Sequence, residues 1–194
     1  MFLFIFLIIF FIANIIQVLT GFGGTLLAMP FSIKLIDIAD AKAVLNLMAL
    51  IACSVIAIKD RKYICFKEFI KISGLMLIGI AAGLLLEKFV AQQILQYFYG
   101  AFIIIVAIFN LLCKKQFQLP VFLQIIIIIC AGIIHGMYVS GGSLLVMYAT
   151  FALTDKKEFR ATLSLVWVLL NSALLIIQLI TCTFSSYALI LSAL

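Results

Sequence analysis

Charged residues are scarce in this sequence. Only 10% of its 194 residues are Asp, Glu, Lys or Arg, whereas 68% are hydrophobic and the mean hydropathy is +1.40. A water-soluble domain carries about a quarter charged residues, so this composition excludes an ordinary soluble protein. The sequence therefore indicates an integral membrane protein.

The residue types that build catalytic and metal sites are also rare. The sequence has one histidine, His135, and its long apolar segments contain no carboxylate, so a membrane enzyme would lack the side chains for acid–base or metal chemistry. The five cysteines form no close pair, and we interpret them as small apolar packing residues. A Gly-x-x-x-x-Gly-Lys motif for ATP is missing as well. We therefore predict neither an enzyme nor a metal or cofactor site.

The few charges divide the chain into long apolar segments. Segments free of charge cover residues 1–33, 43–58, 72–86, 89–113, 116–154 and 161–194. A helix that crosses the hydrocarbon of a bilayer needs about 20 apolar residues, fewer if its ends snorkel, so these segments predict transmembrane helices. The last two are too long for one crossing and must contain breaks or turns. Runs such as Ile125–Ile129 lack the alternation of a membrane β-barrel, and the predicted fold class is an all-α, polytopic transmembrane helical bundle.

The sequence repeats itself. Residues 13–58 align without a gap with residues 131–176, a shift of 118 residues, and 15 of the 46 aligned pairs are identical. About five identities are expected by chance in a chain this rich in Ile and Leu. We interpret the chain as two homologous halves, with residues 1–117 as the first transmembrane repeat and residues 118–194 as a shortened second repeat.

Each half carries a glycine pair beside hydroxyl residues within an apolar stretch. These motifs predict breaks in the helices, because glycine is costly inside a helix and irregular backbone is tolerated in a membrane only against protein or water. The helices that begin after Gly24 and Gly142 would point their free N–H groups and positive dipole ends at an anion. Close helix packing by the small residues is the alternative. The candidate substrate-binding residues of the two motifs are Thr20, Gly21, Gly23, Gly24, Thr25, Ser140, Gly141, Gly142 and Ser143.

Four polar residues in the neighbouring apolar segments complete the candidate substrate site. His135 aligns with Gln17, and it is either a substrate ligand or proton carrier, or a neutral side chain hydrogen-bonded to another helix. Asn46 and Asn171 each lie in the span after a glycine motif, where they either line the pathway or bond between helices.

Small or charged residues elsewhere have simpler interpretations. Gly74, Gly79 and Gly83 are spaced along one span and are expected to pack against another helix. Lys42 and Arg160 occupy matching loops together with Asp40 and Glu158. We interpret these four as charges at the membrane interface, with a gating ion pair as the alternative.

The two motifs together resemble the sulfite exporter TauE/SafE family of bacterial membrane transporters. The resemblance rests on the stretch Gln17–Gly24 followed by Pro30, on its counterpart His135–Gly142, and on the basic stretch Lys59–Arg61. It implies about eight spans in two halves and the passage of sulfite, sulfonates or related small anions through the bacterial inner membrane. The sequence departs from this pattern at Tyr148, which aligns with Pro30, and in the shortened second half.

We therefore predict a multi-pass membrane permease that moves small anions by alternating access, as a secondary transporter. A membrane subunit with a structural or assembly role and an anion channel are the alternatives. The expected partners are a small anionic substrate and the lipid bilayer, without nucleic acid, and assembly into a homo-oligomer is left open.

Overall fold

The described part of the chain is helical. In this computed structural model the described residues are 2–35, 38–91, 93–94, 97–98, 100–101, 103–105, 108 and 120–180. Their helices are α1 (Phe2–Thr20), α2 (Gly24–Leu35), α3 (Ile38–Lys59), a 3-10 turn (Arg61–Tyr63), α4 (Phe66–Phe89), α6 (Val121–Tyr138), α7 (Gly142–Ala152) and α8 (Lys156–Ile180). The predicted all-α fold is confirmed for these residues.

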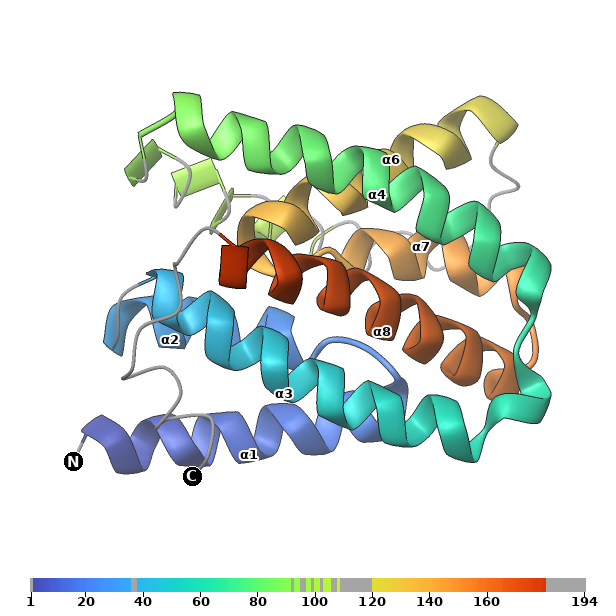
Figure 1. Cartoon of the computed structure of the whole chain (residues 1–194), viewed down its shortest axis with the longest axis horizontal. Helices are drawn as coiled ribbons and strands as arrows, with labels where there is room; N and C mark the ends of the chain where they lie inside the picture. Colours follow the sequence, from blue (N-terminus) through green and yellow to red (C-terminus); the bar gives the residue numbers. More distant parts are fainter. Residues whose placement is uncertain are drawn as a thin grey trace.

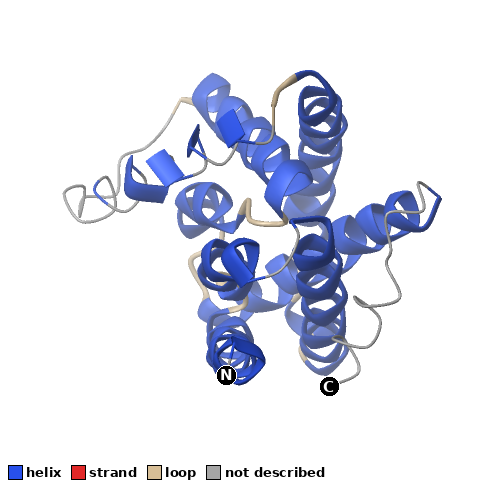
Figure 2. Cartoon of the chain, turned by 90° about the vertical axis from the view of Figure 1, so that its left-hand side faces the viewer, coloured by secondary structure: helices blue, strands red, loops and turns tan. Residues whose placement is uncertain are grey.

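Four of the helices are long and apolar enough to cross a bilayer. These are α3, α4, α6 and α8, which correspond to predicted apolar segments of the sequence. Figure 2 shows several of the helices nearly end on, as expected for spans that share one direction through a membrane. Most of the predicted span at residues 89–113, the end of the chain from residue 181, and the proposed boundary between repeats at residue 117 lie outside the described residues.

The chain reverses direction at each glycine motif. Figure 1 shows α1 running away from the N-terminus and α2 returning beside it, and α6 and α7 are arranged in the same way. Buried Ala28 and Met29 of α2 accordingly pack with Phe10 and Ala13 of α1. We call α1–α2 the first hairpin and α6–α7 the second hairpin. The shorter helix of each pair therefore folds back along the preceding helix instead of prolonging it.

Glycines bring α4 and α6 into close contact. A Cβ atom built on Gly79 would lie 2.8 Å from the Cα of Gly132, and one on Gly83 would collide with the backbone of Ile133. The packing role predicted for these two glycines of α4 is thus confirmed. The prediction is wrong for Gly74, because a Cβ built there meets nothing within 4 Å.

Candidate functional site

Two short loops form the tips of the hairpins. The first tip (residues 21–24) consists of the loop between α1 and α2 with the first residue of α2, and the second tip (residues 139–142) consists of the loop between α6 and α7 with the first residue of α7. Gly21 and Gly23 have φ angles of +82° and +89°, which glycine adopts without the steric cost that a Cβ brings. Val139 aligns with Gly21 and has a φ of +54°, a conformation that is rare for a β-branched residue. Both reversals therefore begin with a left-handed residue at the same aligned position.

Backbone hydrogen bonds at the two tips also recur at aligned positions. The Gly21 nitrogen donates to the Gln17 carbonyl oxygen at 2.8 Å, and the Val139 nitrogen donates to the His135 carbonyl oxygen at 2.7 Å. Matching bonds close the first turn of the second helix in each hairpin: Leu27 to Gly23 at 3.1 Å and Leu145 to Gly141 at 3.2 Å. The two aligned stretches of the sequence thus have the same backbone hydrogen bonds at these positions.

One glycine of each motif packs against its own hairpin. A Cβ on Gly24 would lie 2.6 Å from the Ala13 carbonyl oxygen, inside the closest approach that real Cβ atoms show. A Cβ on Gly141 would collide with the Ala131 carbonyl oxygen and lie 2.9 Å from the Cβ of His135. Ala13 and Ala131 occupy aligned positions, so Gly24 and Gly141 both allow close packing against an aligned carbonyl group, although the two glycines are shifted by one position.

Gly142, the other glycine of the second motif, faces the first hairpin. A Cβ built on Gly142 would lie 3.8 Å from the Gly23 nitrogen and 3.8 Å from the Cβ of Phe22. The same Cβ would lie 3.7 Å from the Trp167 ring. The two tips, separated by more than a hundred residues in the sequence, therefore meet in the folded chain.

Gln17 and His135 make equivalent side-chain contacts in the two halves. The Gln17 amide group donates to Cys53 Sγ at 3.2 Å, and its oxygen accepts a bond from the Gly24 nitrogen at 2.9 Å. His135 Nε2 lies 3.0 Å from Asn171 Oδ1, and Asn171 aligns with Cys53. Because Oδ1 accepts, Nε2 donates, and His135 Nδ1 has no hydrogen-bond partner among the described residues. The histidine is 2% exposed, so this nitrogen is buried with an unused acceptor.

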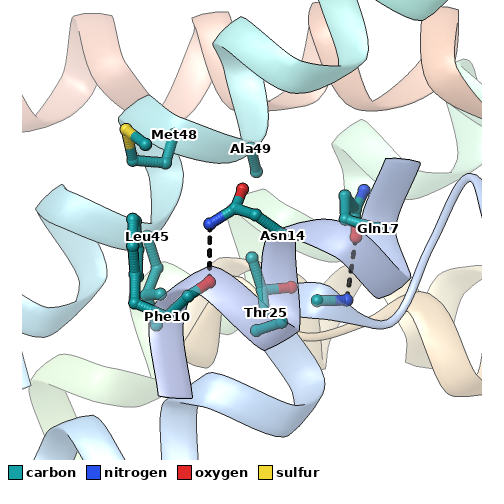
Figure 3. Close-up of a pocket in the computed structure, with 9 residues that line it drawn as sticks. Phe10, Asn14, Gln17, Thr25, Leu45, Met48 and Ala49 are labelled. Atoms are coloured by element: carbon teal, nitrogen blue, oxygen red, sulfur yellow. Dashed lines mark hydrogen bonds between the residues drawn. The ribbon is translucent and has the colours of Figure 1, made fainter. Parts of the chain in front are cut away.

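These residues enclose a small cavity between the two tips. Its volume is about 10 Å³, roughly what a single water molecule needs. Its lining contains no Asp, Glu, Lys or Arg and consists of Gln17, Gly23, Thr25, Leu26, Ala49, His135, Gly142, Trp167 and Asn171. We call it the central cavity. Figure 3 shows an adjacent cavity that shares Gln17, Thr25 and Ala49 with it, and the hydrogen bond from the Gly24 nitrogen to the Gln17 oxygen.

The fold separates the predicted site residues into two groups. Gln17, Gly23, Thr25, His135, Gly142 and Asn171 all line the central cavity. Thr20 instead donates its hydroxyl to the Ile16 carbonyl oxygen at the end of α1. Asn46 donates to the Asn171 carbonyl oxygen and to Gln178 Oε1, so it joins α3 to α8. The residues that belong to or adjoin the tips without lining the cavity are Gly21, Gly24, Ser140, Gly141 and Ser143.

Trp167 is a cavity residue that the sequence interpretation missed. Its ring nitrogen donates to the Gly21 carbonyl oxygen at 3.1 Å, and its ring lies 5.0 Å from that of His135. It aligns with Ala49, so the alignment does not predict a large side chain at this position. The available signal was its place as the one tryptophan of the chain, one helical turn before Asn171. Trp167 of the second half thus ties the first tip in place.

No metal centre is formed within the described part of the chain. No three His, Cys, Asp or Glu side chains gather closely enough there to hold an ion. The chemistry of the central cavity is therefore that of amide, hydroxyl and imidazole groups together with the backbone at two helix starts.

Comparison with known proteins gives one clear result. A family model described as "Sulfite exporter TauE/SafE" matches residues 5–194. The match includes both hairpins and all residues that line the central cavity. No match was found among curated proteins or among solved structures.

Proposed function

Since the chain belongs to the sulfite exporter TauE/SafE family, we propose that it is a secondary permease for a small inorganic or organic anion such as sulfite or a sulfonate. The family match and the apolar helices make it a multi-pass membrane protein of a transporter family. We place it in a bacterial inner membrane, as the family implies. Alternating access is the mechanism that we propose, and the meeting of the two hairpin tips is the observation that carries it.

The starts of α2 and α7 at the central cavity support an anion site. Both helices begin at a tip, and the first-turn N–H groups of a helix carry a partial positive charge. Gly23 and Gly142 leave the backbone open to close approach by a ligand, because neither has a side chain. As long as His135 is neutral, an anion held here would interact with dipoles rather than with a buried cation, which favours reversible binding over tight capture.

The orientation of the two halves supports alternating access. In Figure 1, α1 and α3 run from left to right, whereas α6 and α8 run from right to left. Equivalent elements of the repeat thus have opposite directions, as in the inverted repeats of many secondary transporters. When two such halves exchange conformations, a central site opens first to one membrane face and then to the other.

The size of the central cavity agrees with a closed centre. A cavity of about 10 Å³ has no room for sulfite, so the hairpin tips must separate before an anion passes between them. Only a movement of the hairpins can create that space, because the helices on either side are packed. We infer that this arrangement is a closed state of the proposed transport cycle, with no anion held between the tips.

His135 gives the central cavity a titratable group. Its imidazole is the only ionisable side chain in that lining. Its free Nδ1 can accept a proton, which would give the ring a positive charge and a second N–H donor for an anion oxygen. We propose that this step couples proton movement to anion movement.

Transport by the purified protein tests the proposed function. The chain is reconstituted into proteoliposomes, and uptake is measured for sulfite, sulfate, thiosulfate and simple sulfonates. Saturable uptake of at least one anion, with counterflow of preloaded substrate, supports a permease. Flux that never saturates supports a channel, and the lack of any flux in correctly inserted protein contradicts the proposal.

A further inference from the structure

Two cations at aligned positions are each paired with a distant carboxylate. Lys42, near the start of α3, donates to both carboxylate oxygens of Glu87 at 2.8 Å. Arg160, near the start of α8, donates to Asp60, which follows α3. Lys42 aligns with Arg160 in the repeat, whereas the two carboxylates do not align with each other. The fold thus supplies each cation with a different partner.

Each ion pair lies beside the tip of the other half. A Cβ built on Gly21, in the first tip, would lie 3.0 Å from the Cγ of Arg160. Lys42 shares a cavity with Val139, which occupies the aligned position in the second tip. The two cations therefore have equivalent positions relative to the two tips.

Both cations line cavities much larger than the central one. The cavity at Arg160 has a volume of about 710 Å³ and is also lined by Thr20, Thr150, Lys156 and Lys157. We call it the Arg160 cavity. Its polar lining consists of hydroxyl and cationic groups, a composition suited to an oxyanion.

The cavity at Lys42 has a volume of about 380 Å³ and is also lined by Glu87, Lys88 and Val139. We call it the Lys42 cavity. It lies near the start of α3 and the end of α4. The Arg160 cavity lies near the start of α8, at the other end of the bundle in Figure 1. The central cavity is lined by both tips and lies between these two ends.

We propose that Arg160 and Lys42 are the anion-binding cations of two access cavities, one at each membrane face. An arriving oxyanion replaces Asp60 as the partner of Arg160, or Glu87 as the partner of Lys42. This inference rests on the proposed function and assigns the outer binding sites of the same pathway. In the Lys42 pair the cation keeps an anionic partner throughout, so the more buried charge of that pair is not left unpaired.

The burial of the pairs fits such an exchange. The side chain of Arg160 is 35% exposed and that of its partner Asp60 is 13% exposed. A guanidinium group in contact with the cavity can turn toward an oxyanion and bind it through two N–H groups. In the Lys42 pair the carboxylate is the more exposed member, at 32% against 11%, so Glu87 can leave toward solvent while the lysine stays.

Transport kinetics from each side of an oriented membrane test the assignment. Arg160→Gln is expected to raise KM about tenfold for anion presented on the Arg160 side, because about that much affinity is lost with one charge-assisted hydrogen bond. Lys42→Gln is expected to raise KM by a similar factor on the other side. Asp60→Asn and Glu87→Gln remove the internal competitor and are expected to lower KM on their own sides. Lys62→Gln is the control, because Lys62 is an exposed cation of the same sign that lines neither cavity.

A second measurement does not depend on transport. Thr150 lines the Arg160 cavity and Ala39 lines the Lys42 cavity. Thr150→Cys and Ala39→Cys, in a background without native cysteines other than buried Cys53, are labelled with a membrane-impermeant thiol reagent. We expect labelling from opposite membrane faces, and we expect sulfate or a simple sulfonate to slow labelling of Thr150→Cys unless Arg160→Gln is also present.

The outcomes separate this inference from the proposed function. If the wild type carries an anion while both glutamine variants keep the wild-type KM on both sides, the inference is wrong and the permease assignment stands. Labelling of both cysteines from the same face also overturns it. If no anion is carried but labelling is two-sided and anion-sensitive, the cavities are anion sites and the permease assignment fails.

Discussion

Gly142 in α7 lies directly opposite Gly23 in the first tip, with 3.8 Å between a Cβ built on Gly142 and the Gly23 nitrogen. The two residues belong to different halves of the repeat and to hairpins that enter from opposite directions. Their contact leaves room for a small side chain but little more. On the anion path that we propose, this gap between the tips sets what can pass.

Replacement of Gly142 is expected to block transport without unfolding the protein. An added Cβ would meet its neighbours at 3.7 to 3.8 Å, which is ordinary van der Waals contact, so Gly142→Ala fits. The further methyl groups of Gly142→Val enter a cavity of about 10 Å³. We expect Gly142→Val to insert normally and to lose at least about tenfold in uptake rate, with Gly142→Ala in between.

Gly74→Val is the matched control for this change. A Cβ at Gly74 meets nothing within 4 Å, so the same substitution in α4 crowds no neighbour. Equal loss of uptake in both valine variants would show that the effect comes from glycine replacement in general and not from the gap between the tips.

Gly24 is expected to behave in the opposite way. Gly24→Ala places a Cβ 2.6 Å from the Ala13 carbonyl oxygen and 2.8 Å from the Gln17 Cβ, so α2 must move away from α1. We expect the variant to lose about 1–3 kcal/mol of stability, seen as a lower Tm in detergent, whereas Gly142→Ala keeps the wild-type Tm. An unchanged Tm for Gly24→Ala would mean that α2 does not pack against α1 in this way.

Trp167 gives a direct optical signal from the central cavity. It is the one tryptophan in the chain, and it lines the cavity beside His135. We expect anion binding to change its fluorescence in the wild type with a saturable dependence on concentration. The signal should disappear in Gly142→Val, and its persistence there would place the bound anion elsewhere.

His135→Gln tests the proposed proton coupling. The glutamine amide can keep a hydrogen bond toward Asn171 Oδ1 but does not titrate near neutral pH. We expect the wild-type uptake rate to depend on pH and the variant rate to lose that dependence while uptake persists. Identical pH profiles would leave His135 as a structural side chain that bonds α6 to α8.

The sequence predicted the helices, and it predicted breaks at the two glycine motifs, but it did not predict that the chain reverses direction there. Apolar segments mark spans through their length, and glycine pairs mark where a helix ends, yet both signals are local. The return of α2 along α1 depends on tertiary contacts, such as that between Gly24 and Ala13. The alignment of Gln17 with His135 did identify two residues that line the same cavity.

Partners far apart in the sequence were beyond local prediction. Lys42 pairs with Glu87, 45 residues away, and Arg160 pairs with Asp60, 100 residues away. Asp40 and Glu158 lie much nearer to these cations in the sequence. Trp167 bonds to Gly21 across 146 residues. The contacts of Arg160 and Trp167 depend on the packing of α8 against α3 and the first tip, whereas the contact of Lys42 joins α3 to α4. No periodicity of the chain encodes either arrangement.

A disulfide between the two tips tests the central claim most directly. The Cβ built on Gly142 lies 3.8 Å from the Cβ of Phe22, the separation that a disulfide typically spans. We predict that Phe22→Cys with Gly142→Cys, in a background without the other accessible cysteines, carries anion when reduced and stops when oxidised, and that reduction restores uptake. Failure of the pair to cross-link, or undiminished uptake by the cross-linked protein, would contradict an anion path that opens between the hairpin tips.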